Sequence, residues 1–134
     1  MSDEITTTAT DANALDIPSG YICTIDRTSR EGVIKVANAL SDAESLADYG
    51  DKHFILTDVV TTPGVRTRTG EVCTNIYLLT ADGTILMSQS DGIKRSVQQI
   101  VGLFGGDFGE GIEVAVVTKA LKSGNSLKTL HFFA

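Results

Sequence analysis

Basic side chains are concentrated in the predicted turns of this sequence, although the chain as a whole is acidic. Its 134 residues include seventeen acidic and eleven basic ones, which gives a formal net charge of −6 at pH 7. In the segment TTPGVRTRTGEV (61–72), Arg66 and Arg68 alternate with threonines, although Pro63 and Gly64 would suffice to make a turn. Two guanidinium groups in an exposed turn are suited to binding phosphate.

Further basic residues fall at the last predicted hairpin and at the start of a predicted helix. Lys119, Lys122 and Lys128 surround the turn LKSGN, and Lys94 and Arg95 lie in the first turn of the helix. Cations at a helix N-terminus oppose the helix dipole at a cost of a few tenths to about 1 kcal/mol. A functional role would explain this placement, and an ordinary solvated pair of charges explains it equally well.

The two parts of the chain differ in charge. Residues 1–51 contain ten acidic and three basic residues, a net charge of −7, whereas residues 52–134 contain seven acidic and eight basic residues, a net charge of +1. A positive surface is what binds the phosphates of a nucleic acid. Because a near-neutral domain can present one basic face, the acidic composition does not exclude a nucleic-acid partner.

The first eighteen residues are polar, acidic and without hydrophobic periodicity. This composition predicts a flexible acidic N-terminal tail (1–18) ahead of a single domain (19–134). The tail lacks the basic and apolar regions of a signal peptide, and no stretch approaches eighteen consecutive apolar residues. We therefore expect a cytoplasmic protein without a membrane partner. No feature of the sequence determines its oligomeric state.

Residue patterns typical of enzymes are missing from the sequence. The two histidines, His53 and His131, fall in predicted strands, and neither has a Cys or carboxylate at metal-ligand spacing. The glycine-rich stretch 102–111 follows a predicted helix, whereas a phosphate-binding loop follows a strand and opens a helix. Cys23 and Cys73 form no CxxC pair, so we expect two reduced, partly buried thiols. We expect no catalysis, no cofactor and no metal site.

The hydrophobic pattern predicts a mainly β domain with one inserted α-helix. Asp82-Gly83 is a strong hairpin signal, and apolar residues at three- and four-residue steps predict the helix over 90–106. Ser41 and Glu44 have the spacing of a capping box, which favours a short helix or helical loop in 41–51. The fold that fits is a small, partly open antiparallel barrel of the oligonucleotide-binding (OB) kind. The predicted strands are 20–26, 33–40, 53–60, 72–80, 84–90, 111–120 and 125–133.

Alternation along the strands assigns side chains to faces. In 72–80 it places Val72, Ile76 and Leu78 toward the core and Tyr77 on the other face, whereas both faces of 125–133 carry aromatic residues. Single-stranded nucleic acid binds to a basic groove with flat side chains on which bases stack. We predict stacking by Tyr77 and by His131 or Phe133. The predicted phosphate contacts are Arg66, Arg68, Lys119, Lys122 and Lys128.

The order of these segments resembles that of a known family. The segments REGVIKVANALSDAESLADYGD, YLLTADGTILMSQSDGIKRSVQQIVGLFG and IEVAVVTKALKSGNSLKTLHFF are similar in layout to the single-stranded DNA-binding proteins of small tailed bacteriophages with protein-primed replication. The match covers roughly residues 30–133. It implies sequence-independent binding of displaced single strands during genome replication, without catalysis or cofactor. Tyr49 and Tyr77 are the tyrosines in the matching region, and the longer, more basic 61–72 turn leaves open whether stacking or charge dominates.

Alternative functions remain at this stage. One is a structural or protein-interaction β-domain that acts through an edge strand or through oligomer contacts. Another is a small hydrolase or nucleotide-binding enzyme, for which the sequence offers only the glycine-rich stretch and two histidines. The acidic tail is a candidate contact for replication proteins, or a means of preventing self-association.

Overall fold

A six-stranded mixed sheet organises the fold of this computed structural model, in which residues 21–50 and 52–134 are described. The strand order is β2-β5-β4-β3-β6-β7. Neighbouring strands are antiparallel except for β2 and β5, which are parallel. The strands are β2 (Glu44–Ser45), β3 (Phe54–Val65), β4 (Val72–Thr80), β5 (Ile85–Ser88), β6 (Ile112–Ala120) and β7 (Ser126–Phe133), and the helices are α1 (Arg30–Asp42), α2 (Leu46–Tyr49) and α3 (Asp91–Phe104).

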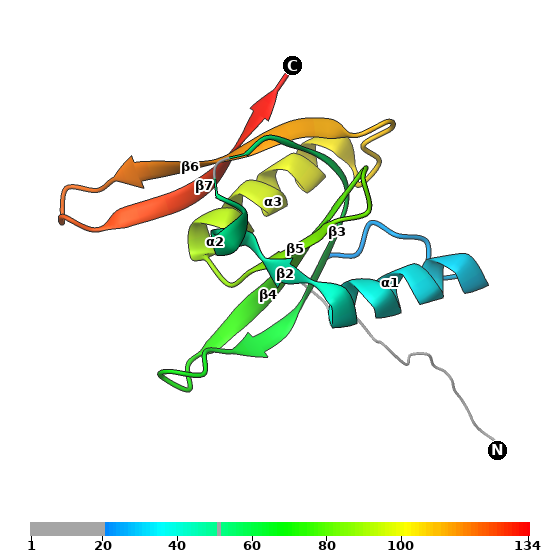
Figure 1. Ribbon diagram of the computed structural model, residues 1–134, viewed down its shortest axis with the longest axis horizontal. Coiled ribbons are helices and arrows are strands. Elements are labelled where there is room, and N and C mark those ends of the chain that lie inside the picture. The colour runs from blue at the N-terminus through cyan, green and yellow to red at the C-terminus, as the bar shows by residue number, and fades with distance from the viewer. Residues whose placement is uncertain (1–20, 51) are drawn as a thin grey trace.

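Strand β3 bends the sheet into a half-barrel. It pairs with β4 along most of its length, with an irregularity between Leu56 and Asp58, but it pairs with β6 only from Phe54 to Leu56. Beyond this short contact the β6–β7 hairpin diverges from the β3–β4 hairpin, and both project on the side of the molecule away from α1 (Figure 1). The predicted mainly β, partly open OB-like barrel is confirmed.

The turn between β4 and β5 forms as predicted at Asp82-Gly83. Gly83 adopts a positive φ of 90°, which glycine allows without strain. The Thr80 hydroxyl donates a hydrogen bond to Asp82 Oδ1 at 2.6 Å, and the Thr84 N–H donates another at 2.9 Å. These bonds lower the pKa of the Asp82 carboxyl, the Thr80 bond being the larger cause.

Helix α3 closes one end of the half-barrel. Ser90 caps its start, Gly105 ends it with a φ of 72°, and Ile93, Val97 and Ile100 are buried in the core against the strands. The helix also covers the edge strand β7, because the Leu130 N–H donates to the buried Ser96 hydroxyl at 3.0 Å. The predicted helix over 90–106 is confirmed.

Segment 33–40 is helical, and the prediction of a strand there is wrong. Ser29 caps α1 by accepting a hydrogen bond from the Gly32 N–H. Gly32, Val36 and Ala39 are its buried residues, and their spacing of three and four is that of one helix face. This face covers the outer side of the sheet, where Val36 and Ala39 share a core cluster with Tyr77. The valines and isoleucine that suggested a strand are therefore overridden by tertiary packing.

Two other predicted elements differ in detail. Ser41 lies near the end of α1 and donates to the Ala37 carbonyl rather than capping a new helix, so the helix predicted in 41–51 is reduced to α2. Segment 20–26 forms no named strand over its described residues, but the isolated bridge between Cys23 and Val60 holds it against β3. The described chain thus has three helices rather than one. The predicted 1–18 tail and the domain boundary at 19 lie outside the described residues.

Candidate nucleic-acid interface

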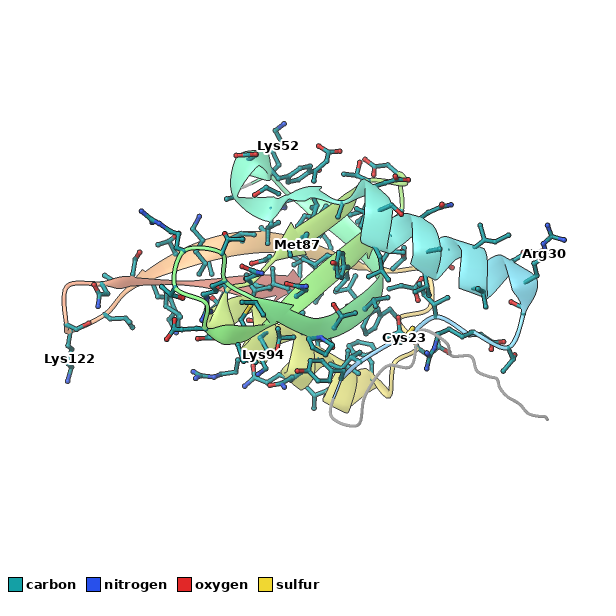
Figure 2. The ribbon with its side chains drawn as sticks, turned by 90° about the horizontal axis from the view of Figure 1, so that it is seen from below. Cys23, Arg30, Lys52, Met87, Lys94 and Lys122 are labelled. Atoms are coloured by element: carbon teal, nitrogen blue, oxygen red, sulfur yellow. The ribbon has the colours of Figure 1, made fainter. Side chains whose placement is uncertain are left out.

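From Val114 onward, the β6–β7 hairpin carries basic residues without acidic ones. Residues 114–134 contain three lysines and no acidic residue. Strand register places Lys119 opposite Leu127 and Lys128 opposite Thr118, so the two lysines point to opposite faces of the hairpin. Lys122 lies at its tip, at the opposite end of the molecule from Arg30 on α1 (Figure 2).

One face of this hairpin and α3 enclose a groove of about 440 Å³. Lys119 and His131 line it from the hairpin, and Arg95 and Gln99 line it from α3. All four side chains are exposed, so they can reach a ligand without a rearrangement of the core. The structure thus brings together two of the predicted contacts and adds Arg95. The remaining lining residues are Gly92, Ser96, Val117, Leu127, Thr129 and Leu130.

An aromatic cluster lies beyond His131 on the same face of the hairpin. The His131 and Phe133 ring centroids are 4.7 Å apart in an edge-to-face arrangement. The His53 ring stacks on Phe133 with a centroid distance of 4.6 Å and an interplanar angle of 24°. His53 Nδ1 lies 2.6 Å from Glu113 Oε2 on the neighbouring strand. Two segments that are distant in the sequence, residue 53 and the end of β7, thus present their rings at one place, and β6 adds the Glu113 carboxylate.

Lys128 belongs to a second hollow, of about 390 Å³, on the other face of the hairpin. Thr118 joins it from β6, Ser88 and Ser90 line it from the junction of β5 and α3, and Ala47 lines it from α2. Leu46, Ile93 and Val116 also line it, so the hollow combines hydroxyl groups and one ammonium group with apolar side chains. Both faces of the β6–β7 hairpin therefore offer polar contacts to a ligand.

Arg66 and Arg68 have different surroundings in the β3–β4 hairpin. The Arg66 guanidinium donates to the Gln89 carbonyl oxygen at 3.0 Å and lies 3.5 Å from Asp91 and 3.8 Å from Glu71. Arg68 is exposed and forms no ion pair with another described residue. The first arginine thus ties its hairpin to the start of α3, and the second is available to a ligand.

The tyrosines do not present open stacking surfaces. Tyr77 is only 8% exposed, because it packs against Val36 and Ala39 of α1. Its ring lies in a core cluster in this structure, whereas stacking on a base needs an open ring face; stacking by Tyr77 stays a prediction. Tyr49 is half-buried, with its ring edge-to-face against Phe54 and the Lys52 ammonium 5.4 Å from its centroid.

Arg95, Gln99 and His53 lie in the groove or in the aromatic cluster but were not among the site residues predicted from the sequence. The cost of placing a cation at a helix N-terminus had marked Arg95, although an ordinary surface charge explained it equally well. No local signal marks Gln99 or His53, because their neighbours in the groove and in the aromatic cluster come from other segments.

Metal sites, thiols and membrane-spanning helices were also considered for residues 21–50 and 52–134. No group of three or more His, Cys, Asp or Glu side chains is arranged to hold a metal ion in this part of the chain. Cys23 and Cys73 are free thiols, half-buried and buried. No helix in the described residues is long and apolar enough to cross a membrane.

Comparison with known proteins identifies the family. No curated protein and no solved structure matches the chain. A family model described as phage single-stranded DNA-binding protein, of the phi29 type, matches residues 17–132. This match includes the β3–β4 hairpin, α3, the groove and the β6–β7 hairpin up to Phe132. The chain therefore belongs to the phi29-type family of phage single-stranded DNA-binding proteins, which act in phage DNA replication.

Proposed function

We propose that the protein binds single-stranded DNA without sequence preference and protects displaced strands during replication. The observation that carries this proposal is the groove between α3 and the β6–β7 hairpin, in which Arg95 and Lys119 lie near the exposed ring of His131. Cationic groups bind any phosphate, and an aromatic ring stacks on any unpaired base. Such a surface favours single strands, because the bases of a duplex are stacked on one another.

The strand path extends from the groove to both hairpins. Lys119 and Arg95 contact phosphates in the groove, and Lys122 and Lys128 extend the contacts over the tip and the second face of the β6–β7 hairpin. Arg66 and Arg68 supply contacts from the β3–β4 hairpin, with Arg68 the more available of the two. His131 stacks on a base. These roles agree with the exposure and location of each side chain.

The proposal also covers the cellular location of the protein and its protein partners. The protein acts in the host cytoplasm as a binding protein, without catalysis and without a cofactor. Its acidic N-terminal segment (1–18) contacts replication proteins. The charge difference between residues 1–51 and 52–134 supports separate roles for the two parts.

Titration of a fluorescent poly-dT strand tests the proposal. The wild type should bind at low salt, prefer the single strand over a duplex of equal length, and lose affinity as salt increases. Each lost phosphate contact should reduce the log–log salt slope by about 0.7. We therefore expect Lys119→Ala and Arg95→Ala to reduce the slope. Arg30→Ala, which removes one positive charge from α1 at the other end of the molecule, should leave it unchanged. No binding at low salt would refute the proposal.

One observation favours a different function. Strand β6 pairs with β3 only through Ile112–Val114, so in the described structure its backbone from Ala115 to Ala120 lacks a strand partner on that side. An open strand edge can add a strand from another chain. The protein would then be a structural or interaction module. Light scattering would show a stable oligomer with no salt-dependent DNA affinity in that case.

A further inference from the structure

The rings of His53, Phe133 and His131 lie on the outer side of the sheet and not in its core. Along β7, Leu130 belongs to the core cluster that also contains Ile93, Val97 and Ile100 of α3, and Phe132 packs against that cluster. Because side chains alternate along a strand, His131 and Phe133 point to the opposite face. Neither described core cluster includes any of the three rings. His53 and His131 are exposed, the His53 side chain by 53%, and Phe133 is half-buried between them. The cluster therefore contributes little to the core and leaves ring surface open.

The arrangement of the rings is suited to a flat ligand. Phe133 is covered by the parallel His53 ring and contacted by the His131 ring, so the two imidazoles are the outer members of the cluster. Glu113 lies opposite Phe133 in the strand register, and its carboxylate holds His53 by the nitrogen Nδ1. Ala115, opposite His131, is small and buried, so no large neighbour on β6 stands over that ring.

The charges nearby indicate how a nucleotide would lie. Lys119 is six residues from Glu113 along β6, a distance of about 20 Å. The cationic end of the face attracts phosphates, whereas Glu113 repels them from the aromatic end. A single strand on this face would therefore keep its phosphates near Arg95 and Lys119 and turn a base toward the rings.

We propose that His53, Phe133 and His131 form a base-stacking subsite at the end of the groove, with an unpaired nucleobase as its ligand. This proposal rests on the proposed function and adds His53 to the site. The two histidines are the stacking surfaces, Phe133 is the spacer that supports them, and Glu113 positions His53. Stacking on an aromatic side chain contributes about 1 to 3 kcal/mol per base, or about 5- to 150-fold in affinity.

An abasic oligonucleotide keeps its phosphates but has no bases, so it separates the contribution of base stacking to the binding affinity from the contribution of charge. The experiment compares dT and fully abasic strands of equal length, titrated against the wild type, His53→Ala, His131→Ala, and the ring-preserving variants His53→Phe and His131→Phe. We expect each alanine variant to bind the dT strand about 5- to 150-fold more weakly and to bind the abasic strand as the wild type does. The phenylalanine variants should retain most of the dT affinity. Ile34→Ala, an exposed residue on α1, is the control that should change neither.

A spectroscopic readout is available because the chain contains no tryptophan. His53→Trp introduces a single reporter at the outer ring, and its fluorescence should be quenched by dT but not by the abasic strand. Equal losses on both strands, or unchanged dT affinity in both alanine variants, would overturn the subsite while leaving DNA binding intact. Failure of the wild type to bind any strand would overturn the proposed function and the subsite together.

Discussion

At the scale of single residues, the two arginines of the β3–β4 hairpin differ in their contacts. Arg66 already interacts with the Gln89 carbonyl, Asp91 and Glu71. Arg68 is exposed. A guanidinium shared among three oxygen-bearing groups has fewer donors left for phosphate. The sequence indicated an anion-binding turn, but it could not show that Asp91, twenty-five residues further along the chain, would engage one of the two arginines.

We expect Arg68→Ala to reduce the salt slope of single-strand binding by about 0.7 without changing stability. Arg66→Ala should change the slope less and lower the free energy of unfolding by about 1 to 2 kcal/mol, mainly through the lost hydrogen bond to a carbonyl. Urea unfolding and salt-dependent titration of both variants measure the difference. A larger slope change in Arg66→Ala than in Arg68→Ala would contradict this expectation.

Tyr77 shows the limit of face assignment from one strand. Alternation correctly placed it opposite Ile76 and Leu78, but both faces of β4 are buried because α1 covers the second one. The strand pattern alone gave no information on that cover. The burial of Tyr77 could therefore not be foreseen, because the segment that covers it, 33–40, was predicted as a strand.

Tyr77→Ala should destabilise the fold by about 3 to 5 kcal/mol, as expected for loss of a buried aromatic side chain. Tyr77→Phe, which keeps the ring, should leave affinity for single-stranded DNA unchanged. Urea unfolding measures the first effect and titration the second. Normal stability of Tyr77→Ala combined with weaker DNA binding would show that the ring faces the ligand.

At the scale of elements, the contact between α3 and β7 shapes the groove. A Cβ atom at Gly92 would overlap the Lys128 carbonyl oxygen and contact the Leu127 side chain. Glycine therefore lets the first turn of α3 lie directly against the strand. The sequence predicted α3 and the last hairpin well, since each has a strong local pattern, but their close approach depends on a residue pair thirty-six positions apart.

Gly92→Ala should cost about 1 to 3 kcal/mol through overpacking and should weaken DNA binding by displacing α3 from the groove. Gly102→Ala is the matched control in the same helix, because a Cβ there meets no described atom within 4 Å apart from its chain neighbours and the backbone of its own helix. That variant should be as stable as the wild type or more stable by up to about 1 kcal/mol. Thermal unfolding of both variants tests the contact, and equal stabilities would contradict it.

At the scale of the whole molecule, charge is distributed unevenly. The basic residues of the two hairpins and of the start of α3 lie away from α1 (Figures 1 and 2). The acidic excess is in residues 1–51. The difference in net charge between the two parts of the chain can be counted in the sequence. The OB-like barrel was predicted from the number and order of the strands. The sequence could not place the groove, because the groove joins residues of α3 with residues of a hairpin that β3 directs away from the rest of the sheet.

Deletion of residues 2–16 removes four acidic residues and changes the formal net charge from −6 to −2. Because this charge repels DNA at long range, we expect the truncated protein to bind poly-dT a few-fold more tightly at about 0.02 M salt and equally at about 0.3 M salt. Titrations at both salt concentrations measure the effect. Equal affinities at the lower concentration would show that the N-terminal charge does not act on the DNA.

The central claim is that single-stranded DNA lies in the groove between α3 and the β6–β7 hairpin. Backbone amide chemical shifts of the isotope-labelled protein, recorded with and without a short dT strand, test it most directly. We expect the largest changes at residues 95–99, 117–119 and 127–133 and negligible changes along α1. Changes centred on α1 and on the outer face of β4 and β5, with residues 95–99 and 127–133 unaffected, would contradict the claim.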